Sequence, residues 1–177
     1  MEIGKIAFLE TYTLGENAGI MGAILVTDSE TKPLEFRVTA PIRPTSFQKT
    51  LYGDVLLEHI LVELISVPLL NAVNEQIDLI VVKDPLFLGA NAKQGVRVVR
   101  LVSDEKQKSK SNTAVEPLNT PMNGSAKAFL ETSKKFEEEL KGIKERLEKI
   151  SEVRNLSEPF DRLKAACEQV QSQRTND

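Results

Sequence analysis

Apolar runs, and in one place an alternation of polar and apolar side chains, predict three β-strands in the first forty residues. The alternation is clearest in residues 34–39, where every second side chain is apolar. Residues 3–13 and 20–27 are also apolar enough for strands, and the polar stretch 28–33 separates the second strand from the third. Two apolar runs joined by a short polar segment predict a hairpin, to which the first strand adds as a meander.

A helical period follows a proline-containing corner, because apolar residues now recur at steps of three and four. The spacing predicts a helix that begins after Thr45 and runs to about Val67, with Gln48 completing a capping box and Gly53 marking a break. The side chains expected on its buried face are Phe47, Leu51, Val55, Leu57, Ile60, Leu61, Leu64 and Ile65. Their burial would make this helix the centre of the core.

The next part of the chain predicts a strand, a short helix and a second strand. Residues 78–82 form an unbroken apolar run, which is typical of a strand buried on both faces. Asp84 and Pro85 suit the cap and first turn of a helix over residues 85–94, and residues 96–102 follow as a strand. A connection of this length predicts a parallel pair with a right-handed crossover.

The composition changes after residue 102. Residues 103–125 are rich in Ser, Asn, Thr and Lys and lack aromatic side chains, which predicts a flexible linker. From residue 126 apolar side chains step alternately by four and three, the pattern of a coiled coil or a helical hairpin. We therefore expect a globular α/β head at 1–102, a flexible linker at 103–125 and a helical arm at 126–173.

Charge and cysteine content narrow the possible functions. The formal net charge of −3 gives no overall basic footprint for nucleic acid. The single Cys167 excludes an intramolecular disulfide framework, and with only one His it excludes a Cys/His zinc site within one subunit. We find no secretory signal pattern, and the longest apolar run carries Glu58, His59 and Glu63, so no membrane span is expected. The sequence thus predicts a soluble, cytoplasmic protein without a cofactor.

Taken in order, the predicted elements of the head read β-β-β-α-β-α-β. This order resembles that of ribonuclease-H-like folds in topology, and no motif accompanies it. The resemblance implies that carboxylates from the first strand, the helix and the end of the fourth strand hold two metal ions. The candidate positions in this sequence are Glu10, one of Asp54, Glu58 or Glu63, and Asp84. The chain departs from the pattern at Glu10, where such sites usually have Asp, and Asp84 can serve as a helix cap instead.

The leading hypothesis from the sequence is a non-enzymatic adaptor, an accessory subunit of a larger cytoplasmic assembly. Its head would bind one protein partner, and its coiled-coil arm would form an oligomer or bind a second partner. The residues expected to bind a partner are Phe129, Phe136, Leu140, Ile143, Leu147, Ile150, Phe160 and Leu163.

Two alternatives belong to other classes of protein. One is a metal-dependent nuclease or phosphoryl-transfer enzyme that uses the candidate carboxylates. The other is a nucleic-acid-binding module without catalysis. Its basic face would draw on Arg37, Arg43, Lys49, Arg97 and Arg100, although Arg97 and Arg100 fall on opposite sides of a regular strand.

Overall fold

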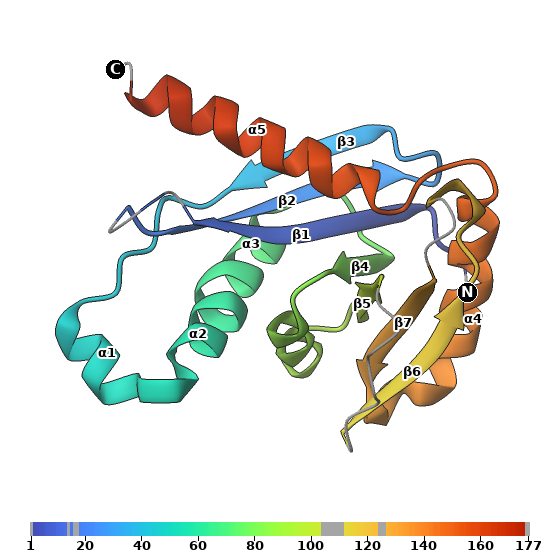
Figure 1. Cartoon of the computed structure of the whole chain (residues 1–177), viewed down its shortest axis with the longest axis horizontal. Coiled ribbons are helices and arrows are strands. Elements are labelled where there is room, and N and C mark those ends of the chain that lie inside the picture. The colour runs from blue at the N-terminus through green and yellow to red at the C-terminus, as the bar shows by residue number, and fades with distance from the viewer. Residues whose placement is uncertain (1, 14, 16–17, 104–111, 124–126, 176–177) are drawn as a thin grey trace.

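A single mixed sheet of seven strands organises the computed structural model, which describes residues 2–13, 15, 18–103, 112–123 and 127–175. The strands are β1 (Lys5–Thr13), β2 (Ile20–Asp28), β3 (Pro33–Val38), β4 (Leu79–Val82), β5 (Val98–Val102), β6 (Thr113–Leu118) and β7 (Ala128–Ser133). Their order across the sheet is β3-β2-β1-β4-β5-β7-β6 (Figure 1). β1, β4 and β5 are parallel to one another, and the other pairings are antiparallel. The predicted meander, parallel pair and mixed α/β fold are confirmed.

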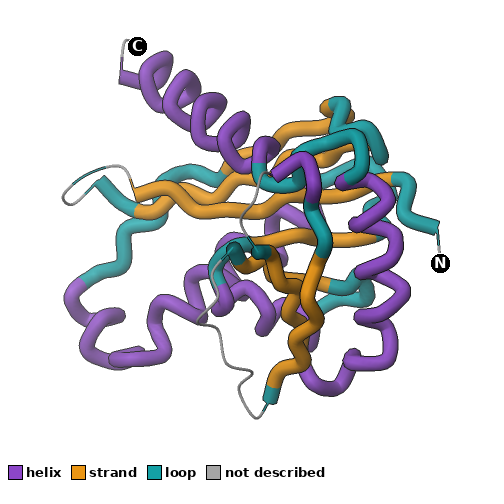
Figure 2. Tube along the Cα trace, turned by 45° about the vertical axis from the view of Figure 1, so that its right-hand side comes forward, coloured by secondary structure: helices purple, strands orange, loops and turns teal. Residues whose placement is uncertain are grey.

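Helices cover both faces of the sheet. One face packs against a long helical segment made of α1 (Ser46–Tyr52), η1 (Gly53–Val55), α2 (Leu56–His59), the π-helix η2 (Ile60–Ser66) and α3 (Val67–Ala72), and against the 3₁₀-helix η3 (Pro85–Ala92). The other face packs against α4 (Glu137–Ser151) and α5 (Glu158–Thr175). Figures 1 and 2 show α5 lying across β1 and β2, with α2 and α3 on the opposite side. Two hydrophobic cores therefore share one sheet.

The long helical segment begins as predicted but buries fewer side chains than predicted. Thr45 and Gln48 form the capping box, and Gly53, with a φ of 52°, ends α1. Of the eight side chains expected in the core, three are buried, namely Ile60, Leu61 and Ile65, and five are exposed, namely Phe47, Leu51, Val55, Leu57 and Leu64. The prediction failed for the first four because α1 projects beyond the sheet, and α1, η1 and α2 bury no residue (Figure 1). Leu64 lies in η2, which buries five of its other residues and leaves Leu64 39% exposed.

The same segment is one helix of 27 residues, Ser46–Ala72, with a mean hydropathy of 1.7 in its most apolar window. By length and composition alone it is long and apolar enough to cross a membrane, so the expectation that no run would reach this length is wrong. One third of that window (33%) is buried inside the fold. A core helix of a soluble protein has the same length and composition, so the finding is weak support for a membrane span.

Two strands lie where the sequence predicted a linker and a helix. Residues 113–118 of the expected linker form the edge strand β6, and residues 128–133 of the expected arm form β7. β7 pairs with β5 and β6, so its backbone hydrogen bonds go to the sheet. Residues 104–111 and 124–125 of the expected linker, and residue 126 of the expected arm, lie outside the described residues. The helical period was misleading here because two of its positions, Phe129 and Ser133, belong to a strand.

The apolar stripe of the predicted arm is buried against the protein's own sheet. Six of the residues expected to bind a partner are between 0 and 8% exposed, namely Leu140, Ile143, Leu147, Ile150, Phe160 and Leu163. Their core includes Phe8 of β1, whose ring meets that of Phe160 edge to face at 5.4 Å. Phe136 lies 3.2 Å from the guanidinium of Arg97, and Phe129 is half-buried within β7. The division into a head and an independent arm is therefore wrong, because residues from both segments form one core.

Candidate functional site

The polar groups that matter most lie where β1 and β4 end side by side. Leu9 pairs with Val82 as the last partners of these parallel strands. The next residues, Glu10 and Lys83, are therefore neighbours. Phe8 and Val81, two residues earlier on each strand, belong to the core on the α5 side. Side chains two residues apart on a strand point to the same face, so Glu10 and Lys83 also face α5. Lys83 was not among the candidates from the sequence.

Burial raises the pKa of Glu10 above its ordinary value, and the neighbouring Asp84 adds to the rise. The backbone N–H of Thr11, which donates to Glu10 Oε1 at 3.0 Å, and the charge of Lys83 act in the opposite direction. The ammonium of Lys83 lies 4.8 Å from the centre of the Phe160 ring, a cation–π contact. Glu10 therefore lies beside a cation, Lys83, and within electrostatic reach of Asp84.

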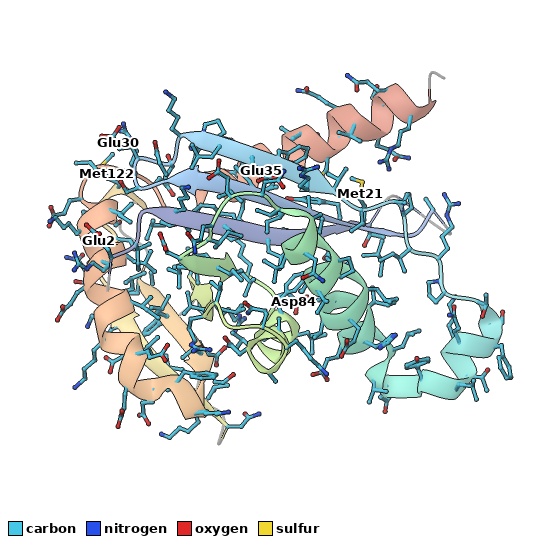
Figure 3. The ribbon with its side chains drawn as sticks, turned by 180° about the vertical axis from the view of Figure 1, so that it is seen from behind. Glu2, Met21, Glu30, Glu35, Asp84 and Met122 are labelled. Atoms are coloured by element: carbon cyan, nitrogen blue, oxygen red, sulfur yellow. The ribbon has the colours of Figure 1, made fainter. Side chains whose placement is uncertain are left out.

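Asp84 has a structural role as the cap of η3. Its Oδ1 accepts a hydrogen bond from the backbone N–H of Leu86 at 2.9 Å, and Pro85 occupies the first turn. Figure 3 shows Asp84 near η3 and the long helical segment, on the face of the sheet opposite α5. This confirms the sequence prediction that Asp84 and Pro85 begin a helix, although the helix is of the 3₁₀ type.

The two helical glutamates of the predicted set lie on the other face of the sheet. Glu63 pairs with Lys93, with its Oε1 3.0 Å from the lysine Nζ. Glu58 lines a separate pocket of about 510 Å³ with Arg100 and Glu131. Neither glutamate is on the α5 side, where Glu10 and Lys83 lie. The charge of Asp84 reaches Glu10, but Asp84 begins η3 on the same face as Glu58 and Glu63, so the structure does not gather the predicted acids into one cluster.

These residues do not fit a pair of divalent metal ions. Two-metal chemistry needs several shared carboxylates around ions that are ~4 Å apart. Within the described parts of the chain, no group of three or more His, Cys, Asp or Glu residues could hold a metal ion. Moreover, the position beside Glu10 holds Lys83, whose ammonium has no lone pair for a metal.

A buried ion pair, absent from the sequence-based predictions, supports the ends of these strands from the opposite face. Arg100 donates from Nε to the Lys83 carbonyl at 2.9 Å, and its Nη1 lies 3.2 Å from Glu131 Oε1. Thr113 Oγ1 donates to the other carboxylate oxygen at 3.1 Å. This network fixes the backbone at Lys83 through a side chain of the neighbouring strand.

The cations that the sequence proposed as one basic face are mostly paired with acids. The pairs are Arg37 with Glu35 at 2.7 Å, Arg97 with Glu139 at 2.7 Å and Arg100 with Glu131 at 3.2 Å. Glu35 also accepts hydrogen bonds from the backbone of Asn74 and Glu75, and Figure 3 shows it on β3 facing that loop. These arginines hold elements of the fold together and do not form one basic surface.

A second group of cations surrounds the carboxyl end of β1. Thr13, the last residue of β1, lines two pockets. One of about 300 Å³ is also lined by Arg43 and Lys49, and the other, of about 580 Å³, is lined by Lys164 of α5. Lys83, which follows β4, lies beside Glu10, three residues before the end of β1.

Neither a protein-family model nor a curated protein matches this sequence. Among solved structures, the chain is similar to an Endonuclease V from Streptomyces avermitilis, with a TM-score of 0.60 and 11% sequence identity. The match covers 98% of this chain and 83% of that chain. It shows that the chain has a ribonuclease-H-like α/β fold, as its topology predicted.

Two further matches are weaker. One is Ciona intestinalis Endonuclease V in complex with a 23mer DNA that contains an inosine followed by a ribo-adenosine, with a TM-score of 0.35, 9% identity, and coverage of 70% of this chain and 50% of that chain. The other is Marinitoga piezophila Argonaute in complex with 5′ OH guide RNA, with a TM-score of 0.37, 10% identity, and coverage of 78% and 25%. At these scores neither match supports a conclusion about this chain.

The adaptor hypothesis is wrong. Nearly the whole chain, including the segment expected to be a coiled-coil arm, matches the fold of a nuclease. The apolar stripe that was to bind a second partner is buried in the chain's own core. No feature of the described residues supports oligomer formation through α4 and α5.

Proposed function

We propose that this protein binds nucleic acid at the carboxyl ends of β1 and β4 and does not cleave it by a two-metal mechanism. The observation that supports this proposal is that Arg43, Lys49 and Lys164 line two pockets at the end of β1. Lys83 adds a cation beside Glu10 on the same strand. In open α/β sheets, ligands bind outside the carboxyl ends of the strands. Cations at such an edge can contact phosphates without any overall positive charge on the chain.

The proposal predicts binding that depends steeply on salt. Fluorescence anisotropy with labelled single-stranded and duplex DNA and RNA should show affinity falling as salt rises from about 50 to about 200 mM. Replacing Lys49 and Lys164 by Ala should weaken binding to all sequences alike and reduce the slope of log K against log salt by roughly 0.7–0.9 for each lost contact. Lys141→Ala on α4 is the matched control, because Lys141 is exposed and lies away from this edge. Absence of salt-dependent binding would contradict the proposal.

A metal-dependent nuclease is the second candidate, favoured by the nuclease fold and by the approach of Glu10 to Asp84. Its test is cleavage of the same labelled strands in Mg²⁺ or Mn²⁺. Cleavage that is lost in Asp84→Ala would establish this candidate over binding alone. Because Asp84 also caps η3, the variant must first be shown to unfold at a temperature close to that of the wild type.

A further inference from the structure

The cations at the end of β1 lie in two pockets on opposite faces of the sheet. The pocket of about 580 Å³ is lined by Lys164 and Cys167 of α5, and Cys167 belongs to the core on the α5 face. The pocket of about 300 Å³ is lined by Lys49 of α1 and by Ile42, which packs against the core on the other face. Thr13 lines both pockets, so both open at the end of β1, and Figure 1 shows α5 and α1 on either side of this strand end.

The fold holds the side chain of Arg43 in the smaller pocket. The backbone of Ile42 exchanges two hydrogen bonds with that of Ile20, at 2.9 and 2.8 Å, which fixes the corner before α1 against β2. Arg43 donates from Nε to the carbonyl of Ala18 at 3.0 Å. Gly19 has a φ of 97° and lies so close that a Cβ there would be 2.8 Å from Arg43 Cγ. The guanidinium therefore has a fixed place, and its two Nη groups bind no acceptor among the described residues.

The cations of the two pockets carry charges that the fold does not neutralise. Unlike the arginines that hold elements of the fold together through acids, Arg43, Lys49 and Lys164 form no ion pair in the parts of the chain that the structure describes. All three side chains are exposed. Glu168 is the one acid among the described residues that line these pockets. The end of β1 therefore presents positive charge on both faces of the sheet, where a polyanion can reach it.

A duplex does not fit the cations of both faces at once. Lys49 lies on α1 and Lys164 on α5, with the ribbon of β1 and β2 between the two helices (Figure 1). The major groove of B-DNA, about 12 Å wide, admits a helix or a two-stranded ribbon, but a ribbon with a helix about 10 Å across on each side is wider than the groove. A duplex also cannot turn round the end of a strand, because its persistence length is about 50 nm. A single strand can make this turn.

We infer that the nucleic acid bound at the end of β1 is a single strand that passes from one face of the sheet to the other. Its phosphates contact Arg43 and Lys49 on the α1 side and Lys164 on the α5 side, with Thr13 between them. A duplex contacts only one of these two sides. The inference rests on the proposed function and names the form of nucleic acid that the site selects.

Lys49→Ala and Lys164→Ala, made separately and together, test whether one ligand contacts both faces. Each single variant should lower the slope of log K against log salt for oligo(dT) by about 0.7, and the double variant by about 1.4, because both contacts belong to the same bound strand. For a duplex of the same length, one of the two single variants should leave the slope unchanged. Lys141→Ala, at an exposed site on α4, is the matched control and should change neither slope.

Two results would overturn the inference but leave the proposed function intact. One is a duplex slope that both single variants lower, which would mean that a duplex reaches both faces. The other is an oligo(dT) slope that only one of them lowers, which would confine the strand to one pocket. If neither ligand shows salt-dependent binding to the wild type, the proposed function fails as well. Both lysines are exposed, so neither substitution should unfold the protein.

Glu168→Gln provides a second measurement with the opposite sign. The substitution removes an acid from the pocket on the α5 side and with it the repulsion of a phosphate at Lys164, so oligo(dT) should bind several-fold more tightly than it binds the wild type. Glu152→Gln, at an exposed site outside both pockets, should leave this affinity unchanged. If Glu168→Gln does not raise the affinity for oligo(dT), no phosphate lies in this pocket and the inference is overturned.

Discussion

Lys83 lies beside Glu10 because β1 and β4 pair in parallel up to Leu9 and Val82. A ribonuclease-H-like topology draws attention to acids at these strand ends, and the sequence offered Asp84 one position later. A strand register cannot be read from an isolated apolar run, so the sequence could not show that the lysine, and not the aspartate, is the direct neighbour of Glu10. Of the predicted carboxylates, Asp84 affects the pKa of Glu10, but among the described residues the predicted set does not form one cluster.

Glu10→Gln should stabilise the protein near neutral pH. Because burial raises the pKa of Glu10 in the folded state, the folded protein holds this proton more tightly than the unfolded chain does. The stability of the wild type therefore falls as pH rises from the ordinary carboxyl value of 4.5 through the higher folded value, and Gln has no such titration. Thermal unfolding should show the variant slightly more stable than the wild type at pH 7 and the difference shrinking below pH 4.5. Glu152→Gln, at an exposed site, is the control.

Cys167 should react slowly with thiol reagents in the free protein. Burial, followed by the charge of Glu168, raises the pKa of its thiol to about 12, so the thiol stays protonated at pH 8. Its reaction with Ellman's reagent at that pH should be at least about 100-fold slower in the folded protein than in the unfolded chain. Rates that agree within a few-fold would show that the thiol is accessible and ionised, against the packing of α5 on β1.

Among the elements, β7 was the hardest to predict from the sequence, which favoured a helix there. Residues 128–132 read Ala-Phe-Leu-Glu-Thr, the same five residues as 7–11 in β1. This identity was a usable signal for a strand, but the four-and-three spacing of the residues around it favoured a helix. By contrast, the first five strands were found because period-two alternation and apolar runs do not depend on distant partners. Whether a helical stripe meets its own sheet or another chain is decided by tertiary contacts that periodicity does not contain.

Two leucines on the long helical segment should differ sharply in their importance. Leu61 in η2 is 1% exposed, whereas Leu51 in α1 is 65% exposed, although both lie on the face that the sequence predicted to be buried. Leu61→Ala should lower the free energy of unfolding by about 2–5 kcal/mol through a core cavity. Leu51→Ala should change it by no more than about 0.5 kcal/mol. Chemical denaturation of both variants measures this, and similar losses at the two sites would mean that α1 is packed against the body.

The whole molecule has three layers, with helices packed on both faces of one sheet. Residues from β1, β2, β4, β5, β6, β7, α4 and α5 share the core on one face. The sequence placed the order of the first seven elements correctly. It divided the molecule in the wrong place because a polar stretch after residue 102 has the composition of a linker whether it ends a domain or connects two strands of one sheet.

A fragment of residues 1–102 should not fold on its own. Without α4 and α5, the apolar side chains of Ile6, Phe8, Met21 and Val81 would be exposed to water on one whole face of the sheet. Circular dichroism and thermal denaturation of the fragment should show no cooperative transition, whereas the full chain should show one. A cooperative transition in the fragment would restore the idea of an independent head and weaken the description of a shared core.

Metal-independent binding is tested by mixing a labelled single strand with the full chain, first in EDTA and then in Mn²⁺, and by recording both binding and cleavage. We expect the same salt-dependent binding in both conditions, because the proposed phosphate contacts come from Arg43, Lys49 and Lys164 and not from a metal ion. We also expect an intact strand after prolonged incubation. Binding that disappears in EDTA, together with Mn²⁺-dependent cleavage by the wild type but not by Asp84→Ala, would contradict metal-independent binding.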